Sequence, residues 1–360
     1  MQQPYFLNEA GNKKMKDGIM LWYAGNNPFI MSITGTDVVV HSTYNGEHVT
    51  QNYPSLGSAA IALQADPNTE VYVEGTITEM LNRSSETKIV CHNTALTTLY
   101  CYSCPALTSL DLSQNTALTD LDCSSCPALT SLDLSHNTAL TDLDCNSCSA
   151  LTSLDFSHNT ALKGLNCHSC SALTSLDLSQ NTALTILYCN SCPALTSLDL
   201  SHNTALTGLY CYSCLALTSL DLSHNTALTG LYCYSCPALT SLDLSHNTAL
   251  KTLYCYSCPA LTSLDLSHNT ALTELDCNSC PALTSLDLSQ NTALTELDCS
   301  GCNYIETIKY VAQNTDVATE IAGLISKAFA TDGNVYCKGT YSSTVQTAAT
   351  SKGWTYHTLE

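Results

Sequence analysis

The sequence is poor in charged residues, and above all in cationic ones. Charged residues make up 12% of the 360 positions, and 11 Lys and Arg stand against 31 Asp and Glu, which gives a formal net charge of -20. A protein that binds nucleic acid or an anionic membrane surface needs a basic patch, so this balance argues against both partners. It leaves cationic partners, metal ions and neutral glycans open.

Long apolar runs are missing as well. No stretch of 18 apolar residues occurs, so the sequence predicts no membrane insertion. The apolar stretch Ile19–Ala24 is too short for a secretory signal, and no small-residue cleavage site follows it. We therefore expect a soluble chain made in a cytoplasm, which could reach the outside by lysis or as part of a virus particle.

Catalytic signatures are also missing. The sequence has no nucleotide-binding glycine loop and no H-E-x-x-H motif. Ser, His and Asp recur in most coils, so their presence does not indicate a catalytic triad. His41 and His48 near the N-terminus have no evident partner in the sequence. We predict a protein that is not an enzyme, with no catalytic residue, no cofactor and no metal ligand.

Internal repetition is what the sequence does have. From Asn93 to Cys302 it repeats every 22 residues in ten units, the last of them cut to about half. The unit that begins at Asn115 reads NTALTDLDCSSCPALTSLDLSH, and it divides into two similar halves of 11 residues. One half has the form L-x-x-L-x-C and the other the form L-x-x-L-D-L. Such a period indicates a solenoid in which each coil buries its leucines only against its neighbours.

The alternation of side chains predicts β-structure. In Leu132-Asp133-Leu134 both leucines would point inward and the aspartate outward. We expect each coil to form two short strands, one on each side of the solenoid. A helix is excluded because the repeat has no 3.6-residue stripe and is rich in β-branched Thr.

The L-x-x-L-x-L-x-x-N segment resembles the defining segment of leucine-rich repeats. The nested arrangement is similar to the bacterial leucine-rich-repeat class called IRREKO, and this resemblance covers about 210 residues. It implies that the Asn satisfies backbone groups in the following bend. The sequence departs from that class at one position, because a second Cys, such as Cys104 or Cys126, stands where the class usually has Asn after the Cys half.

The chain therefore divides into three parts: a β-rich N-terminal domain over 1–92, the solenoid over 93–302 and a small α/β capping module over 303–360. In the first part we predict strands at 29–34, 37–41, 70–77 and 88–91, separated by turns and by prolines such as Pro54, with 70–77 as an edge strand. In the last part we predict a strand at 305–311, a helix at 316–330 capped by Thr315 or Asp316, a strand at 335–337, a helix at 342–352 and a strand at 354–359.

Twenty of the 22 cysteines form ten C-x-x-C pairs. Neighbouring pairs such as Cys123/Cys126 and Cys145/Cys148 match the spacing of a four-cysteine zinc site. However, the first Cys occupies the place of a core Leu in the sister half, and the second occupies the place of the bend Asn. We favour a ladder of buried, reduced cysteines, and disulfides between coils or bound metal remain alternatives.

Stacking turns each outward position into a column. Nine Asp residues form one such column: Asp111, Asp133, Asp155, Asp177, Asp199, Asp221, Asp243, Asp265 and Asp287. Six histidines form another: His136, His158, His202, His224, His246 and His268. Cation binding along the aspartates is one interpretation, but a solvated face that prevents aggregation is the one we favour. The histidines interchange with Gln, which favours a polar column over metal ligands.

The candidate binding site is a cluster of tyrosines, because Tyr gives a large contact area with little loss of entropy. Its members are Tyr188, Tyr210, Tyr212, Tyr232, Tyr234, Tyr254 and Tyr256. A simple preference of Tyr for exposed strands is the competing explanation.

Together these features predict a structural and recognition protein. We expect a phage fibre or decoration protein that presents a rigid solenoid to virion proteins or to a host-surface protein or glycan. A homo-oligomer is left open. A bacterial cell-surface adhesin is the first alternative, and a metal-binding cysteine-rich protein is the second.

Overall fold

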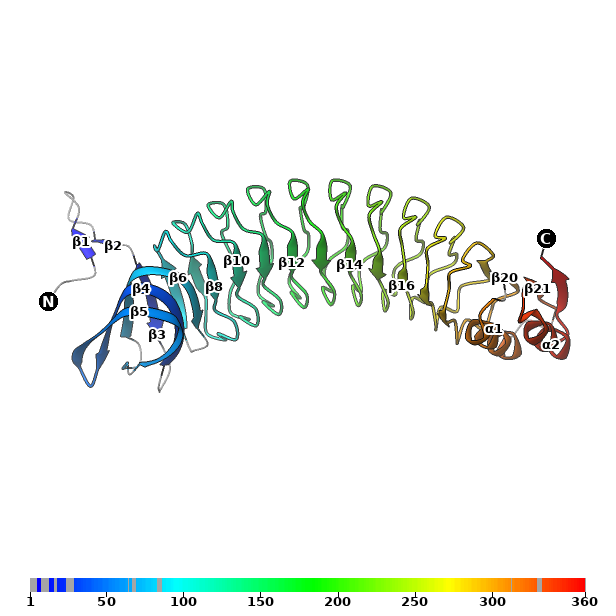
Figure 1. Cartoon of the computed structure of the whole chain (residues 1–360), viewed down its shortest axis with the longest axis horizontal. Coiled ribbons are helices and arrows are strands. Elements are labelled where there is room, and N and C mark those ends of the chain that lie inside the picture. Colours follow the sequence, from blue (N-terminus) through cyan, green and yellow to red (C-terminus); the bar gives the residue numbers. More distant parts are fainter. Residues whose placement is uncertain are drawn as a thin grey trace. The chain divides into compact units, whose positions relative to one another are not determined.

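The computed structural model describes residues 5–7, 13–15, 18–23, 29–63, 65–66, 69–82, 86–311, 313–328 and 332–359. The chain divides into two compact units, Met1–Asn181 and Thr182–Glu360. The first holds the N-terminal strands and the first coils, and the second holds the remaining coils and the C-terminal module (Figure 1). Each unit is mainly β, and the described residues form a leucine-rich-repeat β-solenoid with two short helices.

The N-terminal part of the first unit is built from long antiparallel strands. The strands are β1 (Tyr5–Leu7), β2 (Lys13–Met15), β3 (Gly18–Tyr23), β4 (Phe29–Tyr44), β5 (Glu47–Leu63), β6 (Thr69–Asn82) and β7 (Glu86–Cys91). Strand β4 pairs with β5 and β6, and β3 pairs with β6 and β7. The prediction of β-structure here is confirmed, although β4 runs through the two strands that we expected at 29–34 and 37–41.

Two details of the N-terminal prediction were wrong. The segment 70–77 lies in a central strand rather than an edge strand, since β6 pairs with β3, β4 and β8, and Val71, Tyr72 and Val73 are all buried. Pro54 does not separate strands but lies inside β5, opposite Asp37, which has a positive φ of 54°. The register passes from Thr36↔Ser55 to Val38↔Tyr53 there, and among the described residues β5 pairs with β4 alone, so the proline lies in an edge strand, where proline is tolerated.

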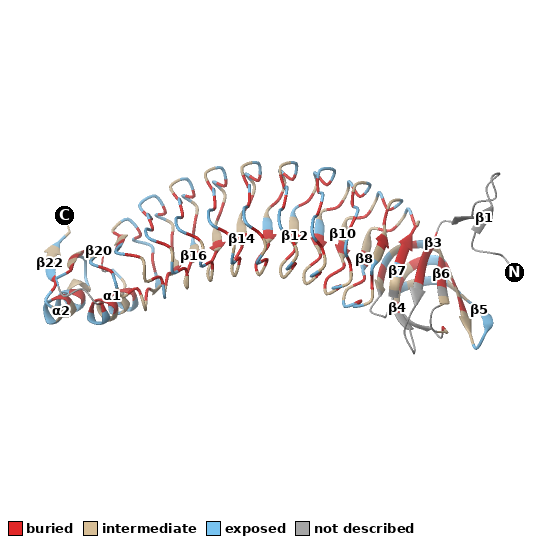
Figure 2. Cartoon of the chain, turned by 180° about the vertical axis from the view of Figure 1, so that it is seen from behind, coloured by how far each residue is buried: buried red, intermediate tan, exposed pale blue. Residues whose placement is uncertain are grey.

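This N-terminal sheet continues directly into the first coil. Strand β6 pairs in parallel with β8 (Thr98–Tyr100) on the side of the solenoid formed by the L-x-x-L-x-C halves, the Cys side. Strand β7 pairs in parallel with β9 (Ser109–Asp111) on the opposite side, the L-D-L side. Strand β3 lies between β6 and β7, so the sheet wraps around the end of the solenoid. The apolar residues at that end are therefore covered, as Figure 2 shows by the concentration of buried residues in β3, β6 and β7.

Each coil forms a regular strand in its Cys half, just before the first Cys. In the first unit these strands are β8, β10 (Asp120–Asp122), β11 (Asp142–Asp144) and β12 (Gly164–Asn166). In the second unit they are β13 (Ile186–Tyr188), β14 (Gly208–Tyr210), β15 (Gly230–Tyr232), β16 (Thr252–Tyr254), β17 (Glu274–Asp276) and β19 (Glu296–Asp298). Within each unit successive strands pair in parallel with a shift of one 22-residue repeat, as in Leu209↔Leu231.

The expectation of two strands per coil was wrong for most coils. The L-D-L half has the predicted alternation, with Leu132 and Leu134 buried and Asp133 exposed, but between coils it forms mostly isolated bridges such as Asp199↔Asp221. In the second unit, regular strand pairing is lost on the L-D-L side because the backbones of successive coils lie further apart there than on the Cys side. On the Cys side, the amides of Thr229 and Gly230 donate to the carbonyl of Thr207 at 2.9 and 3.1 Å. On the L-D-L side, the amide of Thr262 donates to the carbonyl of Thr240 at the longer distance of 3.4 Å.

The bend asparagines form a buried ladder. In the second unit, Nδ2 of Asn225 donates to the backbone oxygens of Asn203 at 2.9 Å and Leu200 at 3.1 Å, which belong to the preceding coil. Asn247, Asn269 and Asn291 repeat both bonds. The expected role of Asn in satisfying backbone groups is therefore confirmed, and the bonds also fix the distance between coils.

The second cysteine of each pair takes the place of this asparagine. The Sγ of Cys236 lies 3.3 Å from the backbone oxygen of Cys211, 25 positions earlier, which is the same offset as Asn225 to Leu200. All 22 cysteines are buried free thiols. Burial raises the pKa of Cys236 and Cys280 to about 12, so these thiols stay protonated at neutral pH and donate. Among the described residues, no group of three His, Cys, Asp or Glu side chains is placed to hold a metal ion.

The bend between the two cysteines requires a left-handed residue. The Ser of each C-x-S-C motif from Ser103 to Ser279 has φ between 54° and 59°, and Gly301, with φ of 76°, holds this position in the last motif. The amide of this residue donates to the next coil, as from Ser213 to the carbonyl of Tyr234 at 2.9 Å. The strain of a non-glycine residue in this region is thus offset by a bond between coils.

The aspartate column has a structural role that the sequence interpretation missed. In every L-D-L half, the Oδ1 of Asp accepts the amide of the Ser two residues later, at 3.0 Å from Asp221 to Ser223, and so begins the bend. The same bond recurs at Asp111, Asp133, Asp155, Asp177, Asp199, Asp243, Asp265 and Asp287. Nine repeats of one Asx turn explain nine aspartates without a bound cation.

The C-terminal module of the second unit continues the ladder on the L-D-L side. Strands β18 (Ser285–Leu288), β20 (Thr307–Val311), β21 (Asn334–Lys338) and β22 (Thr355–Thr358) pair in parallel in that order. Helices α1 (Thr315–Lys327) and α2 (Ser342–Lys352) connect the last three strands, and within the described residues neither is long and apolar enough to cross a membrane. The predicted βαβαβ order is confirmed.

The N-cap of α1 was predicted wrongly. Asn314, not Thr315 or Asp316, caps the helix, because its side chain accepts the amides of Asp316 and Val317. Helix α1 ends at Lys327, and residues 329–330 of the predicted helix lie outside the described residues. Helix α2 has the predicted bounds, and Gly353 caps its C-terminus in the left-handed conformation, at φ 85°.

We expect Asn225→Ala to lower the free energy of unfolding by about 1–3 kcal/mol, because two buried hydrogen bonds are lost. The cost is moderate because the amides of Asn203 and Leu206 still donate to the carbonyls of Leu200 and Asn203. Asn225→Cys should lose less, since a thiol makes one of the two bonds in the sister half. Urea unfolding followed by circular dichroism measures both, and equal losses for Ala and Cys would contradict the equivalence of the two ladders.

We expect stability to fall as the pH drops below about 4, the ordinary pKa of Asp. The Ser amides lower the folded-state pKa of Asp199, Asp221, Asp243 and Asp265, so their contribution is full above the unfolded pKa and is lost as pH falls through the folded one. Urea midpoints between pH 7 and pH 3 measure this. A variant with Asn at these four positions keeps an acceptor that does not titrate and should show a weaker pH dependence. An unchanged dependence would show that other groups dominate.

Candidate functional site

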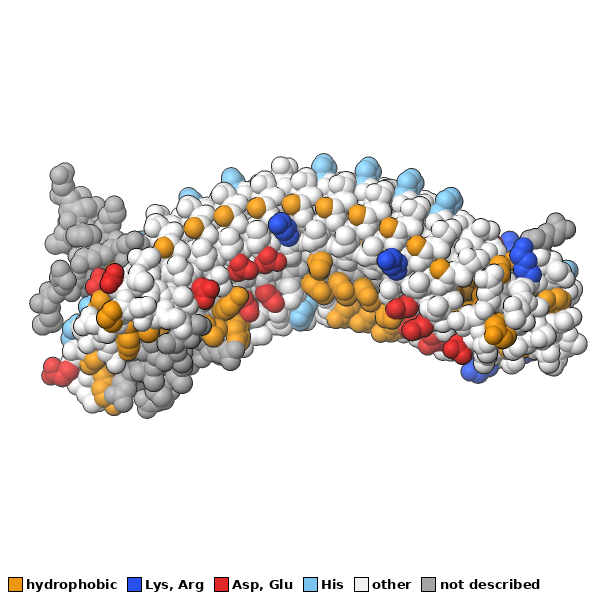
Figure 3. Space-filling model, in the orientation of Figure 1, with side chains coloured by type: hydrophobic (Ala, Val, Ile, Leu, Met, Phe, Trp, Pro, Cys, Tyr) orange, Lys and Arg blue, Asp and Glu red, His pale blue; other side chains and the backbone are white. Residues whose placement is uncertain are grey.

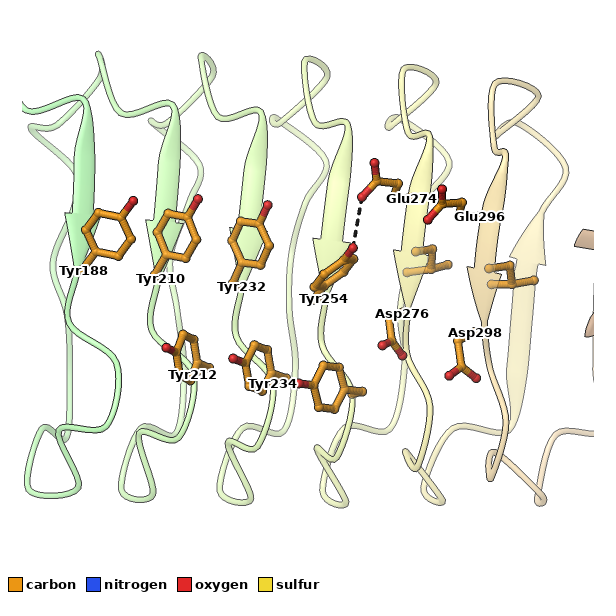
Figure 4. A pocket seen from close by; sticks show the side chains of 13 residues that line it. Tyr188, Tyr210, Tyr212, Tyr232, Tyr234, Tyr254, Glu274, Asp276, Glu296 and Asp298 are labelled. Carbon is orange, nitrogen blue, oxygen red and sulfur yellow. Dashed lines mark hydrogen bonds between the residues drawn. The ribbon is translucent and has the colours of Figure 1, made fainter. Parts of the chain in front are cut away.

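The seven predicted tyrosines lie together on the Cys side of the second unit. They form two columns, because each 22-residue repeat places a tyrosine beside the one in the next coil. Tyr188, Tyr210, Tyr232 and Tyr254 end strands β13 to β16, and Tyr212, Tyr234 and Tyr256 follow the first Cys of their coils (Figure 4). All seven are half-buried, with their rings at the surface of one patch.

The rings stack on one another along each column. In the first column the ring centroids of Tyr188 and Tyr210 lie 4.3 Å apart, and those of Tyr210 and Tyr232 lie 4.4 Å apart at 4° between planes. In the second column both separations are 4.3 Å, from Tyr212 to Tyr234 and from Tyr234 to Tyr256. A binding partner therefore meets ring edges and hydroxyls more than open ring faces.

Two glycines leave the space that tyrosine rings of the first column occupy. Gly208 and Gly230 precede Tyr210 and Tyr232 by two residues, so they lie on the same face of their strands. A Cβ at Gly230 would lie 3.2 Å from Cε2 of Tyr232, closer than ordinary packing allows. The ring thus leans over the glycine, and a hollow of about 300 Å³ lies beside it, lined by Ile186, Lys251 and neighbouring residues.

Tyr254 ends the first column with a different geometry. Its ring is turned 85° from that of Tyr232, at 5.2 Å between centroids. Its hydroxyl donates to Oε2 of Glu274 in the next coil at 3.1 Å. Burial, followed by this bond and the charge of Glu274, raises the pKa of Tyr254 to about 12. The tyrosine column is thereby tied to the carboxylates that follow it.

Four carboxylates continue the patch beyond the tyrosines. Glu274 and Glu296 begin β17 and β19, and Asp276 and Asp298 end them in the column positions that hold tyrosine in earlier coils. Figure 4 shows the four acidic side chains beside the tyrosines, and Figure 3 shows acidic side chains adjoining a hydrophobic cluster on this face. Asn278 donates to Asp276 at 2.7 Å and to Asp298 at 3.2 Å. The sequence interpretation missed these four residues, although the change from Tyr to Asp at Asp276 and Asp298 in the first tyrosine column was visible.

Tyrosines and carboxylates together line one shallow groove of about 670 Å³. Its floor includes Leu275 and Leu297, and its walls are the seven tyrosines and the four acidic residues. Such a surface offers apolar contact, hydroxyl donors and negative charge side by side. It fits a partner that brings apolar groups together with positive charge.

The other sequence candidates lie elsewhere. The six histidines of the L-D-L side are exposed, and each bonds the serine that precedes it, as His246 bonds Ser245 at 3.0 Å. In the first unit His41 has partners that the sequence did not reveal: Nε2 lies 3.2 Å from Glu74, and its ring stacks on His48. These contacts hold the side chain within the N-terminal sheet.

Comparison with known families agrees with the repeat. A family described as leucine-rich repeats (2 copies) matches residues 105–148, and one described as a BspA-type leucine-rich repeat region (6 copies) matches residues 168–279. The chain is a leucine-rich-repeat protein. Both matched regions lie inside the solenoid predicted from the 22-residue period.

Two solved structures are similar to this leucine-rich-repeat protein. The functional domain of InlJ from Listeria monocytogenes, described as including a cysteine ladder, is 31% identical, covers 76% of this chain and 77% of its own, and has a TM-score of 0.42. An internalin (inlF) from Listeria monocytogenes is 16% identical, covers 79% of this chain and 87% of its own, and has a TM-score of 0.48. A comparison with curated proteins gave no significant match.

We expect Glu274→Gln to lower the pKa of Tyr254 from about 12 towards the ordinary value of about 10, because the neighbouring negative charge is lost. Absorbance at 295 nm during alkaline titration follows tyrosinate formation, and subtracting the curve of Tyr254→Phe isolates Tyr254. The same titration of Glu306→Gln serves as a control, because Glu306 does not line the groove. An unchanged curve in Glu274→Gln would contradict the bond.

Proposed function

We propose that this leucine-rich-repeat protein is a bacterial surface recognition protein that binds a protein partner through the tyrosine groove. The observation that carries the proposal is the groove itself: seven tyrosines gathered over consecutive coils of a rigid parallel ladder. Tyrosines pre-arranged in this way lose little conformational entropy on binding.

The stacking geometry favours a protein over a neutral glycan. A sugar ring packs best against an open aromatic face, but the faces of Tyr210 and Tyr234 are covered on both sides by their column neighbours. Hydroxyls, ring edges and adjacent carboxylates suit the mixed apolar and polar surface of a polypeptide. The strand preference of Tyr explains one tyrosine at a time, but not a lined groove of this size.

A surface location is supported by the sequence identity to the Listeria InlJ domain and by the BspA-type match. This replaces the phage particle as the favoured location, and a particle becomes an outcome of the test below. Metal storage receives no support from the geometry of the described cysteines, which bond backbone carbonyls through their thiols instead of gathering around a common centre.

The location is tested by quantitative mass spectrometry of the source cells, divided into envelope, cytosol and any virus particles, with protease added to intact cells in a parallel sample. We expect enrichment in the envelope and loss on protease treatment. Fixed copy number in purified particles would support the virion role instead. Residence in the cytosol alone, protected from protease, would contradict a surface function.

A further inference from the structure

We propose that the acidic end of the tyrosine groove selects a Lys or Arg side chain on an extended segment of the protein partner. This deepens the proposed function and rests on it, because the tyrosines would hold the segment while Glu274, Asp276, Glu296 and Asp298 choose its charge. The whole groove is the binding site, and its four carboxylates determine that a positively charged side chain is bound in preference to a neutral one.

The first observation is that like charges face each other in the ladder. Strands β17 and β19 pair so that Glu274 lies opposite Glu296 and Asp276 lies opposite Asp298. Like charges directly opposite each other destabilise a sheet. The ion pairs His41–Glu74 and Lys309–Asp287 do not involve these four carboxylates, and no described Lys, Arg or His is paired with them. A cation from outside would remove the repulsion.

The second observation is that part of this charge is withdrawn from solvent. Asp276 is half-buried beside Leu275, and burial raises its pKa, with the bond from Asn278 opposing this rise and the charge of Asp298 adding to it. A carboxylate held in such surroundings interacts more strongly with a bound cation than one on an open surface does. A partner that carries positive charge into the groove is therefore favoured over a neutral one.

The third observation is the position of aromatic rings beside the carboxylates. Tyr256 is the last tyrosine of its column, because the next coil holds the smaller Asn278 at the equivalent position, and Tyr254 bonds Glu274 through its hydroxyl. An Arg guanidinium packs on an aromatic face while it bonds carboxylates with its edge. Lys offers the same charge with fewer directed bonds. A metal ion uses none of the aromatic surface, and no metal-holding group is found among the described residues.

The first unit contains a natural control. Asp120 faces Asp142 and Asp122 faces Asp144 across the pairing of β10 and β11, which repeats the arrangement of four carboxylates on the same side of the coil. The seven tyrosines of the groove belong to other coils. Removing the charges here changes the net charge equally but should leave groove binding intact.

The experiment is a display selection of random dodecapeptides against the purified full-length chain, followed by fluorescence anisotropy with the strongest peptide. We expect the selected peptides to carry Lys or Arg next to apolar residues. Replacing Arg in that peptide by citrulline, which has a similar shape but no charge, should weaken binding at least tenfold; where the cation is Lys, its acetylated form serves.

Protein variants then separate the two proposals. The quadruple variant E274Q, D276N, E296Q and D298N should lose at least tenfold in affinity, whereas D120N, D122N, D142N and D144N should lose less than twofold. The double variant Y210A and Y232A should weaken every selected peptide. Circular dichroism of each variant checks folding, and the citrulline or acetyl-lysine peptide tests the charge with the protein unaltered.

The outcomes are distinct. Peptides that need the tyrosines but bind equally well without their charge would overturn charge selection and leave protein recognition standing. Binding that is insensitive to the tyrosines would overturn the groove as the site, and with it both proposals. Failure to select any peptide, or preferential binding to neutral glycans on an array, would overturn a linear cationic segment as the occupant.

Discussion

The solenoid depends on one interaction that recurs along the stacked coils: a buried side chain donates to a backbone carbonyl 25 positions earlier. Asn225 makes this bond with its amide to Leu200, and Cys236 makes it with its thiol to Cys211. Carbonyls that turn inward at a bend are shielded from water, and these side-chain donors give them a bond from the following coil in addition to any backbone amide within their own bend. The asparagine and cysteine ladders are thus two solutions to the same constraint, one on each side of the coil.

Because these inner bonds set the spacing, the outer surface is free to vary. The position that holds Asp122 in one coil holds Tyr210 or Asp276 in others, and in each case the neighbouring leucine remains buried. A fixed backbone with variable outward residues is what a recognition surface needs, since side chains of different chemistry can be placed at regular intervals without refolding. The tyrosine groove and its acidic end are two such placements on adjoining coils.

The outward aspartates of the L-D-L half show how easily such a column can be over-interpreted. Nine carboxylates in register look like a cation site in the sequence, but each accepts the amide of the serine that follows, as Asp221 does from Ser223. Among the described residues, Glu274 and Glu296 accept no such backbone amide in a bend. Their carboxylates are therefore better placed than those of the longer column to bind a partner. The distinction depends on the bond each oxygen makes, and spacing alone does not reveal it.

The sequence by itself determined the repeat, the burial of its leucines, the role of the asparagines and the order of the C-terminal elements, because periodicity and local capping are properties of neighbouring residues. It also assembled the tyrosine columns, since a 22-residue period places equivalent residues side by side. Only the tertiary structure decided which half of each coil forms a strand, which strand of the N-terminal sheet is central and which carboxylates adjoin the tyrosines. Those outcomes depend on the distance between coils and on pairing between remote segments, such as β3 with β6 and β7, and no local pattern encodes these distances.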